Sequence, residues 1–109
     1  MSYQILHYFS STGHDEFGEW LRSLRDPRAR GSVSARLNRL AQGNFGDHRY
    51  CRDGVWELRV NVGAGYRIYY ALAGGDIVLL LAGGGKATQA GDIVRACDNW
   101  KDWRKRKRK

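Results

Sequence analysis

Apolar and polar side chains alternate along two stretches in the C-terminal half of the chain, a pattern typical of paired β-strands with one buried face. In the first stretch, Glu57 and Arg59 fall on the polar side, opposite the apolar set Trp56, Leu58, Val60 and Val62. In the returning stretch, Arg67 and Tyr69 lie opposite the apolar set Tyr66, Ile68, Tyr70 and Leu72. We therefore predict a hairpin whose turn contains Gly63 and Gly65, since glycine adopts positive φ freely.

Two arginines share the polar side of this hairpin. A turn centred on Gly63 places Arg59 directly across from Arg67, whereas a turn centred on Ala64 makes them diagonal neighbours and lets Arg59 face Tyr69. Both registers keep the two residues on one face, with backbones within ~8 Å of each other. Like charges at that spacing destabilise a sheet unless an anion lies near them, so the hairpin is a candidate anion site.

The N-terminal half has a helical period after a first alternating run, Tyr3–Phe9, which we predict to be a strand. An apolar stripe at i, i+3, i+4, i+7 spacing then predicts an amphipathic helix, with residues 10–12 supplying capping hydroxyls. Asp26-Pro27 separates this helix from a second one, which ends at Gly43. The stripes are Phe17, Trp20, Leu21 and Leu24 in the first helix and Val33, Leu37, Leu40 and Ala41 in the second. We interpret Arg30, Arg36 and Arg39 as the solvated face of the second helix.

The remaining pattern predicts two more strands and a last helix. Residues 46–52 read as a short polar strand, and Asp53-Gly54 is a strong tight-turn signal before the hairpin. Ile77–Ala82 is apolar on both faces, as expected of an interior strand. The GGGK run after it lacks the spacing of a phosphate-binding loop, so its glycines are expected to let the backbone bend and approach a neighbour closely. Thr88 can cap a helix with the stripe Ile93, Ala96, Cys97 and Trp100.

The predicted order is therefore β-α-α-β-β-β-β-α, which indicates an α+β domain with helices on one face of an antiparallel sheet. At 109 residues the chain is long enough for one core, and residues 1–103 are expected to form a single domain. We expect the other face of the sheet, which carries Arg59 and Arg67, to be open to solvent.

The net charge of +8 is concentrated at the C-terminus, where residues 104–109 are all basic. The rest of the chain has 13 basic and 11 acidic residues, so its net charge is only +2. We interpret the 104–109 segment as a disordered tail that aids solubility; weak RNA binding and a nuclear-import signal have the same composition.

Other features restrict the class of protein. No apolar run approaches the ~20 residues of a membrane span and the N-terminus lacks the layout of a signal peptide, so a cytoplasmic protein without membrane contact is expected. Cys51 and Cys97 form no disulfide framework and are expected to be reduced thiols. His7, His14 and His48 are not at metal-ligand spacing, so we predict no metal site and no cofactor.

The candidate chemistry lies in Arg59, Arg67 and Lys86, with Tyr69, His48 and Arg49 as candidate RNA contacts. Guanidiniums suit phosphate oxygens, and a lysine beside two arginines has its ammonium form disfavoured, which suits proton transfer. Such a set is able to cleave RNA without metal, through attack of a 2′-hydroxyl on the adjacent phosphate. The alternative is that Glu57 pairs with an arginine across the sheet and Lys86 is merely solvated.

Three motifs in this order, GVWELRV, GYRIYY and IVLLLAGGGKATQAGDI, resemble the RelE/ParE superfamily of bacterial toxins, in its HigB-like (addiction module killer protein) branch. The resemblance covers about Tyr3 to Trp103. It implies a small antiparallel sheet with two N-terminal helices and a C-terminal helix. It also implies a toxin of a type II toxin–antitoxin system that cleaves mRNA on the ribosome. The implied partners are mRNA, the ribosome and a helix-turn-helix antitoxin.

By this resemblance Arg59, Arg67 and Lys86 match the catalytic positions, and Tyr69 matches an aromatic position of the motif. Arg49 stands where relatives often carry a lysine, which suits substrate contact for Asp47-His48-Arg49. The chain departs from the family in two places. Ala64 replaces the proline many relatives have in the turn, and the basic tail has no assured counterpart.

Two other functions remain open. The ParE side of the superfamily binds DNA gyrase without catalysis, and it has no need of a clustered Arg/Arg/Lys set. A plain nucleic-acid-binding module driven by the basic tail is the third hypothesis.

Overall fold

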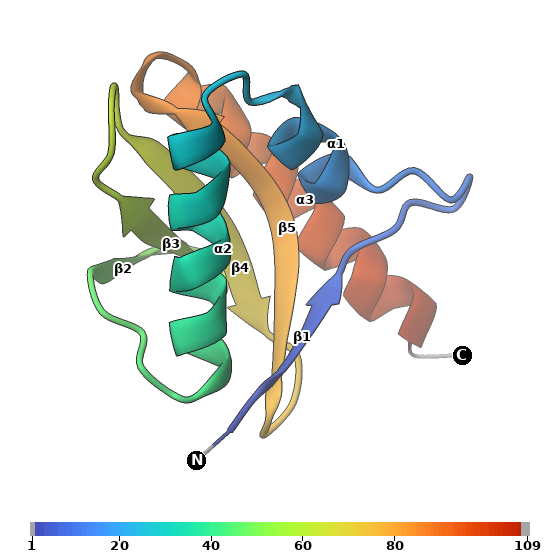
Figure 1. Ribbon diagram of the computed structural model, residues 1–109. Coiled ribbons are helices and arrows are strands. Elements are labelled where there is room, and N and C mark those ends of the chain that lie inside the picture. The colour runs from blue at the N-terminus through green and yellow to red at the C-terminus, as the bar shows by residue number, and fades with distance from the viewer. Residues whose placement is uncertain (1, 108–109) are drawn as a thin grey trace.

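The computed structural model describes residues 2–107 as an α+β domain with a five-stranded open sheet and three α-helices (Figure 1). The predicted order of helices and strands is confirmed. Its elements are β1 (Gln4–His7), α1 (Glu16–Ser23), α2 (Pro27–Ala41), β2 (His48–Arg52), β3 (Val55–Val60), β4 (Tyr66–Leu72), β5 (Ile77–Gly85), the 3₁₀ turn η1 (Lys86–Thr88) and α3 (Gln89–Lys107).

The sheet is mixed, so the prediction of an antiparallel sheet is only partly right. Its strand order is β1-β5-β4-β3-β2, and the last four strands pair antiparallel through short turns. β1 instead pairs parallel to β5, with Gln4 beside Ile77 and His7 beside Leu80. The connection between these two strands is most of the chain, and a connection that long permits parallel pairing.

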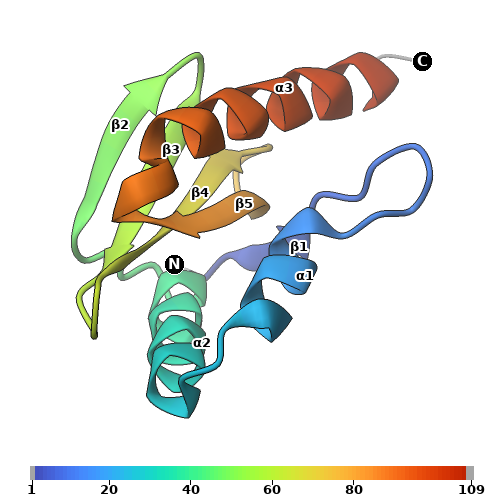
Figure 2. The ribbon, with the colours of Figure 1, turned by 90° about the horizontal axis from the view of Figure 1, so that it is seen from above.

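Helices cover both faces of the sheet, so the expectation of an open second face is wrong. Figure 2 shows α1 and α2 on one side of the sheet and α3 on the other. The α3 face has its own core, built from Tyr69, Ala71, Leu79 and Leu81 of the sheet with Ala96 and Trp100 of α3. β5 is apolar on both faces, as predicted, and each of these faces is buried by helices that pack against it. Arg59 and Arg67 lie on the α3 face.

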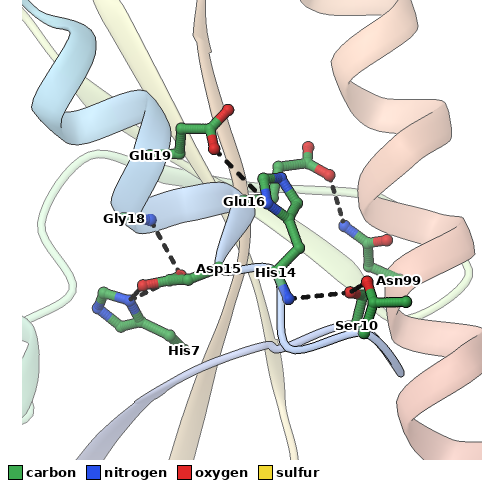
Figure 3. Close-up of polar contacts among 9 residues, drawn as sticks. His7, Ser10, His14, Asp15, Glu16, Gly18, Glu19 and Asn99 are labelled. Carbon is green, nitrogen blue, oxygen red and sulfur yellow. Dashed lines mark hydrogen bonds and ion pairs between the residues drawn. The ribbon is translucent and has the colours of Figure 1, made fainter.

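The helix boundaries follow from local capping residues. Asp26 and Pro27 start α2 as predicted, with the Asp26 carboxylate accepting a hydrogen bond from the Arg28 amide. The α1 cap is Asp15 rather than a hydroxyl of residues 10–12, because its carboxylate accepts from the Gly18 amide and also contacts His7 (Figure 3). The same view shows Glu16 at the start of α1 bonded to Asn99 of α3, so this contact joins the two helix layers.

The glycines at the end of β5 permit close approach from both faces, as the sequence predicts. A Cβ on Gly83 would lie 2.2 Å from the Trp20 ring, and one on Gly84 would lie 1.8 Å from Asp92 Oδ2. Asp92 is buried and accepts a hydrogen bond from the Thr88 hydroxyl, so this packing ties η1 to the first turns of α3.

The basic segment is helical through Lys107, which corrects the expectation of a disordered tail for residues 104–107; residues 108–109 lie outside the described part. Arg106 pairs with Asp102 four residues earlier, and cations lie over aromatic rings, Arg104 over Trp100 and Lys107 over Trp103. Basic side chains also suit the negative end of a helix dipole. These contacts extend α3 by a turn.

No helix within residues 2–107 combines the length and the apolar composition needed to cross a membrane.

The substitution Gly84→Ala tests the close approach of α3 to β5. Asp92 also bonds Arg95, at 2.7 Å, so it cannot move away freely from an added methyl group. We expect the free energy of unfolding to fall by about 1–3 kcal/mol, measured by urea denaturation. Gly31→Ala in α2 is the control, since its Cβ meets nothing within 4 Å and should leave stability unchanged or raised by up to about 1 kcal/mol. Equal stability of the two variants would contradict this packing.

Candidate functional site

The hairpin register places Arg59 directly across from Arg67. This is the arrangement predicted for a turn centred on Gly63, which has φ 55°, with Gly65 at φ 87°. The Gly65 amide donates to the Val62 carbonyl at 2.9 Å and closes the turn. The two guanidinium groups therefore share the α3 face at the end of the sheet nearest this turn.

A buried carboxylate lies between the two arginines. Glu57 is 1% exposed, and its Oε2 accepts from Arg59 Nε at 3.0 Å while its Oε1 lies 3.6 Å from Arg67 Nε. Gln89, the first residue of α3, donates to Oε1 at 3.2 Å. The pairing of Glu57 with an arginine, raised from the sequence as an alternative, is present in the structure. We call Arg59, Arg67 and Glu57 the arginine cluster; its net charge is +1.

The arginines keep donors for a further anion. The side chain of Arg59 is 31% exposed and that of Arg67 is 11% exposed. Arg59 uses one of its five N–H donors on Glu57, whereas Arg67 Nε contacts Glu57 as an ion pair and has no hydrogen-bond partner among the described residues. Because ionic contacts with Glu57 hold both guanidinium groups on one face of the sheet, the pair is preorganised for phosphate oxygens.

Lys86 follows the strand that pairs with Arg67. Gly84 lies opposite Arg67 and Gly85 opposite Tyr66, and Lys86 begins the 3₁₀ turn directly after them. With ~4.8 Å between strands and ~3.3 Å per residue, its backbone lies about 8 Å from that of Arg67. Lys86 is exposed. Glu57 offsets part of the positive charge of the two arginines near Lys86.

Tyr69 cannot stack on a base in this structure, because its side chain is fully buried under α3. Its hydroxyl is buried without a hydrogen-bond partner among the described residues. Burial, with the nearby Glu57 charge, raises the pKa of Tyr69 well above its ordinary value. Tyr69 is therefore part of the core between the sheet and α3, and it does not reach a ligand at the surface.

The two candidate residues of β2 point to opposite faces. Arg49 pairs with Glu57 in the register and lines a hollow of about 220 Å³ that Gln89 and Ile93 of α3 close. His48 pairs with Leu58, and its ring packs against Trp56 and Phe45 with centroid distances of 5.6 Å. The structure thus brings Arg49 to the arginine cluster and places His48 on the other face.

Arg36 of α2 holds the backbone beneath the site, which corrects its interpretation as a solvated residue. It is 8% exposed and donates to the carbonyls of Arg59, Phe45 and Asp47 at 3.1–3.3 Å. Asp47 in turn accepts from the Arg59 amide at 3.0 Å. A signal for this role exists in the sequence, since Arg36 is spaced at i+3 and i−4 from the core residues Val33 and Leu40. Glu57 and Gln89 lack such a signal, because they come together only by folding.

Cys51 lies beside this cluster without forming a reactive thiolate. Its Sγ is 4.0 Å from Glu57 Oε1. Burial and the Glu57 charge raise the pKa of the thiol from 9.0 to about 11. The neutral thiol is a poor nucleophile, so the chemistry of the site rests on its arginines and lysine.

Comparison with known proteins places most of the chain in a phage-derived family. A family model described as "Phage derived protein Gp49-like (DUF891)" matches residues 19–97, which include Glu57, Arg59, Arg67, Lys86 and Gln89. A Haemophilus influenzae protein named only "Uncharacterized protein" is similar, at 46% identity over 80 residues, covering 73% of this chain and 81% of that protein.

The substitution Glu57→Gln tests the carboxylate between the arginines. It keeps the shape of the side chain and leaves two guanidiniums opposed, so we expect the free energy of unfolding to fall by about 2 kcal/mol in low salt. The loss should shrink in 1 M NaCl, because salt screens like-charge repulsion. Urea denaturation at both salt concentrations measures this, with Glu19→Gln as the exposed control. A salt-independent loss would argue against charge compensation.

The reactivity of Cys51 should follow its raised pKa. At pH 8 only about one thiol in a thousand is ionised, so alkylation by iodoacetamide should be much slower than that of free cysteine. The rate should rise about tenfold per pH unit up to about pH 11. Mass spectrometry of the Cys97→Ser variant isolates the Cys51 signal. Alkylation as fast as that of free cysteine at pH 8 would contradict the burial of this thiol.

Proposed function

This chain belongs to the phage-derived Gp49-like family, and from that premise we propose that it is the toxin of a type II toxin–antitoxin system. In this proposal it is an endoribonuclease with a RelE-like fold of the HigB-like branch, and it cleaves mRNA on the ribosome in the bacterial cytoplasm. The observation that supports this most is the pair Arg59 and Arg67, opposed across a hairpin, fixed on one buried carboxylate and partly exposed.

The proposed reaction is an internal transesterification of RNA. The 2′-oxygen attacks the adjacent phosphorus and loses its proton to a base, while the bond to the 5′-oxygen breaks and that oxygen receives a proton. The products are a 2′,3′-cyclic phosphate and a 5′-hydroxyl end. Arg59 and Arg67 donate to the phosphate oxygens and stabilise the charge that grows on them. DNA, which lacks the 2′-hydroxyl, is not cleaved.

Lys86 and Arg49 complete the proposed site. Lys86 stands at the rim near Arg67, where its ammonium either supplies the leaving-group proton or stabilises the phosphorane charge. Arg49 shares the face of Glu57 and contacts the RNA backbone. Tyr69 and His48 have no RNA contact in this proposal, since one is buried and the other lies on the opposite face. The step needs no metal and no small-molecule cofactor.

The ribosome and an antitoxin are the proposed partners. A domain of this size offers little surface to hold an RNA strand in the in-line geometry that attack requires, so we propose that the ribosome positions the message. A helix-turn-helix antitoxin neutralises the toxin in the cell.

Brief induction of the chain without its antitoxin, followed by primer extension on cellular mRNA, tests this function. We expect new discrete ends within translated regions. Arg59→Ala and Lys86→Ala should each reduce their yield by about 10²–10³-fold, because each removes a donor to the developing charge. Arg25→Ala, an exposed arginine between α1 and α2, is the matched control and should cleave like the wild type.

Two results would contradict the proposal. Cleavage and growth arrest that persist in an Arg59→Ala, Lys86→Ala double variant would remove these residues from the site. Intact transcripts with induction of the DNA-damage response would instead favour a gyrase-binding toxin.

A further inference from the structure

Three neighbouring hollows that share lining residues lie along α3, from the arginine cluster to the last turns of that helix. The first hollow, of about 220 Å³, lies between β2 and the start of α3, where Glu57 and Gln89 meet. The second, of about 650 Å³, shares Arg52 with the first and lies between the turn at Asp53 and the middle of α3. The third, of about 610 Å³, shares Lys101 and Arg104 with the second. We call these three hollows together the α3 groove.

The second hollow of the α3 groove is fixed by contacts between α3 and the turn at Asp53-Gly54. Cys97 Sγ of α3 lies 4.0 Å from the Arg52 carbonyl, and the indole of Trp100 packs against Gly54 so closely that a Cβ there would lie 2.8 Å from Nε1. Figure 2 shows β2 and the turn after it beside α3. The second hollow is therefore fixed by the folded domain, while the third is lined by residues of α3 alone.

Positive charge dominates the lining. Six basic residues line the three hollows against three acidic ones: Arg49, Arg52, Lys101, Arg104, Lys105 and Lys107 against Asp53, Glu57 and Asp98. Glu57 contacts the hairpin arginines and Asp53 pairs with Arg52 at 3.8 Å, and over the whole lining the basic residues exceed the acidic ones by three. Since the body of the chain is nearly neutral, the α3 groove is a local concentration of charge.

Aromatic rings restrict the basic side chains at the C-terminal end of α3. Trp100 and Trp103 stack with centroids 5.6 Å apart and planes 19° apart. Arg104 lies 5.0 Å above one ring and Lys107 lies 5.3 Å above the other. Side chains ordered before binding lose less conformational entropy when a phosphate arrives.

We propose that the α3 groove binds the phosphate backbone of single-stranded RNA that flanks the scissile phosphate. This deepens the proposed function and rests on it, because the groove begins at the arginine cluster. From Gln89 to Arg104 the helix rises about 22 Å, enough for a site of about four nucleotides. Single-stranded RNA is the occupant because in-line attack at the cluster requires a strand free of the duplex, and the same strand continues into the groove.

Fluorescence anisotropy with a 2′-O-methyl RNA 10-mer tests the groove apart from catalysis, since that probe cannot be cleaved. The double variant Lys101→Gln, Arg104→Gln should raise Kd by about tenfold or more in 0.1 M KCl. It should also reduce the slope of log K against log salt by about 1.4, which is 0.7 for each lost phosphate contact. The double variant Arg22→Gln, Arg25→Gln, on the opposite side of the sheet, should change Kd by less than twofold.

Three results would overturn the proposal: equal Kd for the groove and control variants, equal affinity for duplex and single-stranded RNA, or unchanged RNA binding with lost affinity for an acidic protein partner. Failure of the catalytic proposal gives a different pattern. In that case wild-type protein still binds the probe through Lys101 and Arg104, but cellular transcripts stay intact. Circular dichroism of each variant confirms that α3 remains helical.

Discussion

The buried carboxylate of Glu57 is the contact on which the candidate site depends. Two guanidiniums directly across a hairpin repel each other, and this carboxylate, 1% exposed and facing the Nε atoms of both, turns their repulsion into a shared ion pair. Gln89 bonds the same carboxylate from α3. The orientation of the arginines therefore requires that the hairpin and the helix dock together.

Docking of α3 in turn depends on the end of β5. The missing side chain at Gly84 admits Asp92, which bonds Thr88 and Arg95 and so sets where the helix begins. From that start the helix runs beside the turn at Asp53, and its basic residues line the second and third hollows of the α3 groove. One close approach between a strand and a helix thus positions the exposed lysine, the arginine cluster and the α3 groove.

Support also comes from the opposite face of the sheet. Arg36 of α2 donates to three carbonyls, among them that of Arg59, and fixes the loop that leads into β2. Burial lowers the pKa of Arg36, yet three carbonyl acceptors stabilise its charge. On one face of the sheet, α2 therefore holds the backbone of the site. On the other face, α3 holds its side chains.

Local sequence patterns were enough to predict the order of the elements, the turns at Asp53-Gly54 and Gly63-Ala64-Gly65, and the common face of Arg59 and Arg67. These depend on side-chain period and on the φ preference of glycine, which act within a few residues. Only the tertiary structure decided that α3 covers that face, that Tyr69 is buried there, that β1 pairs parallel and that Glu57 meets Gln89. Each of these depends on contacts between residues far apart in the chain, and periodicity shows which side of a strand is polar but not what will pack against it.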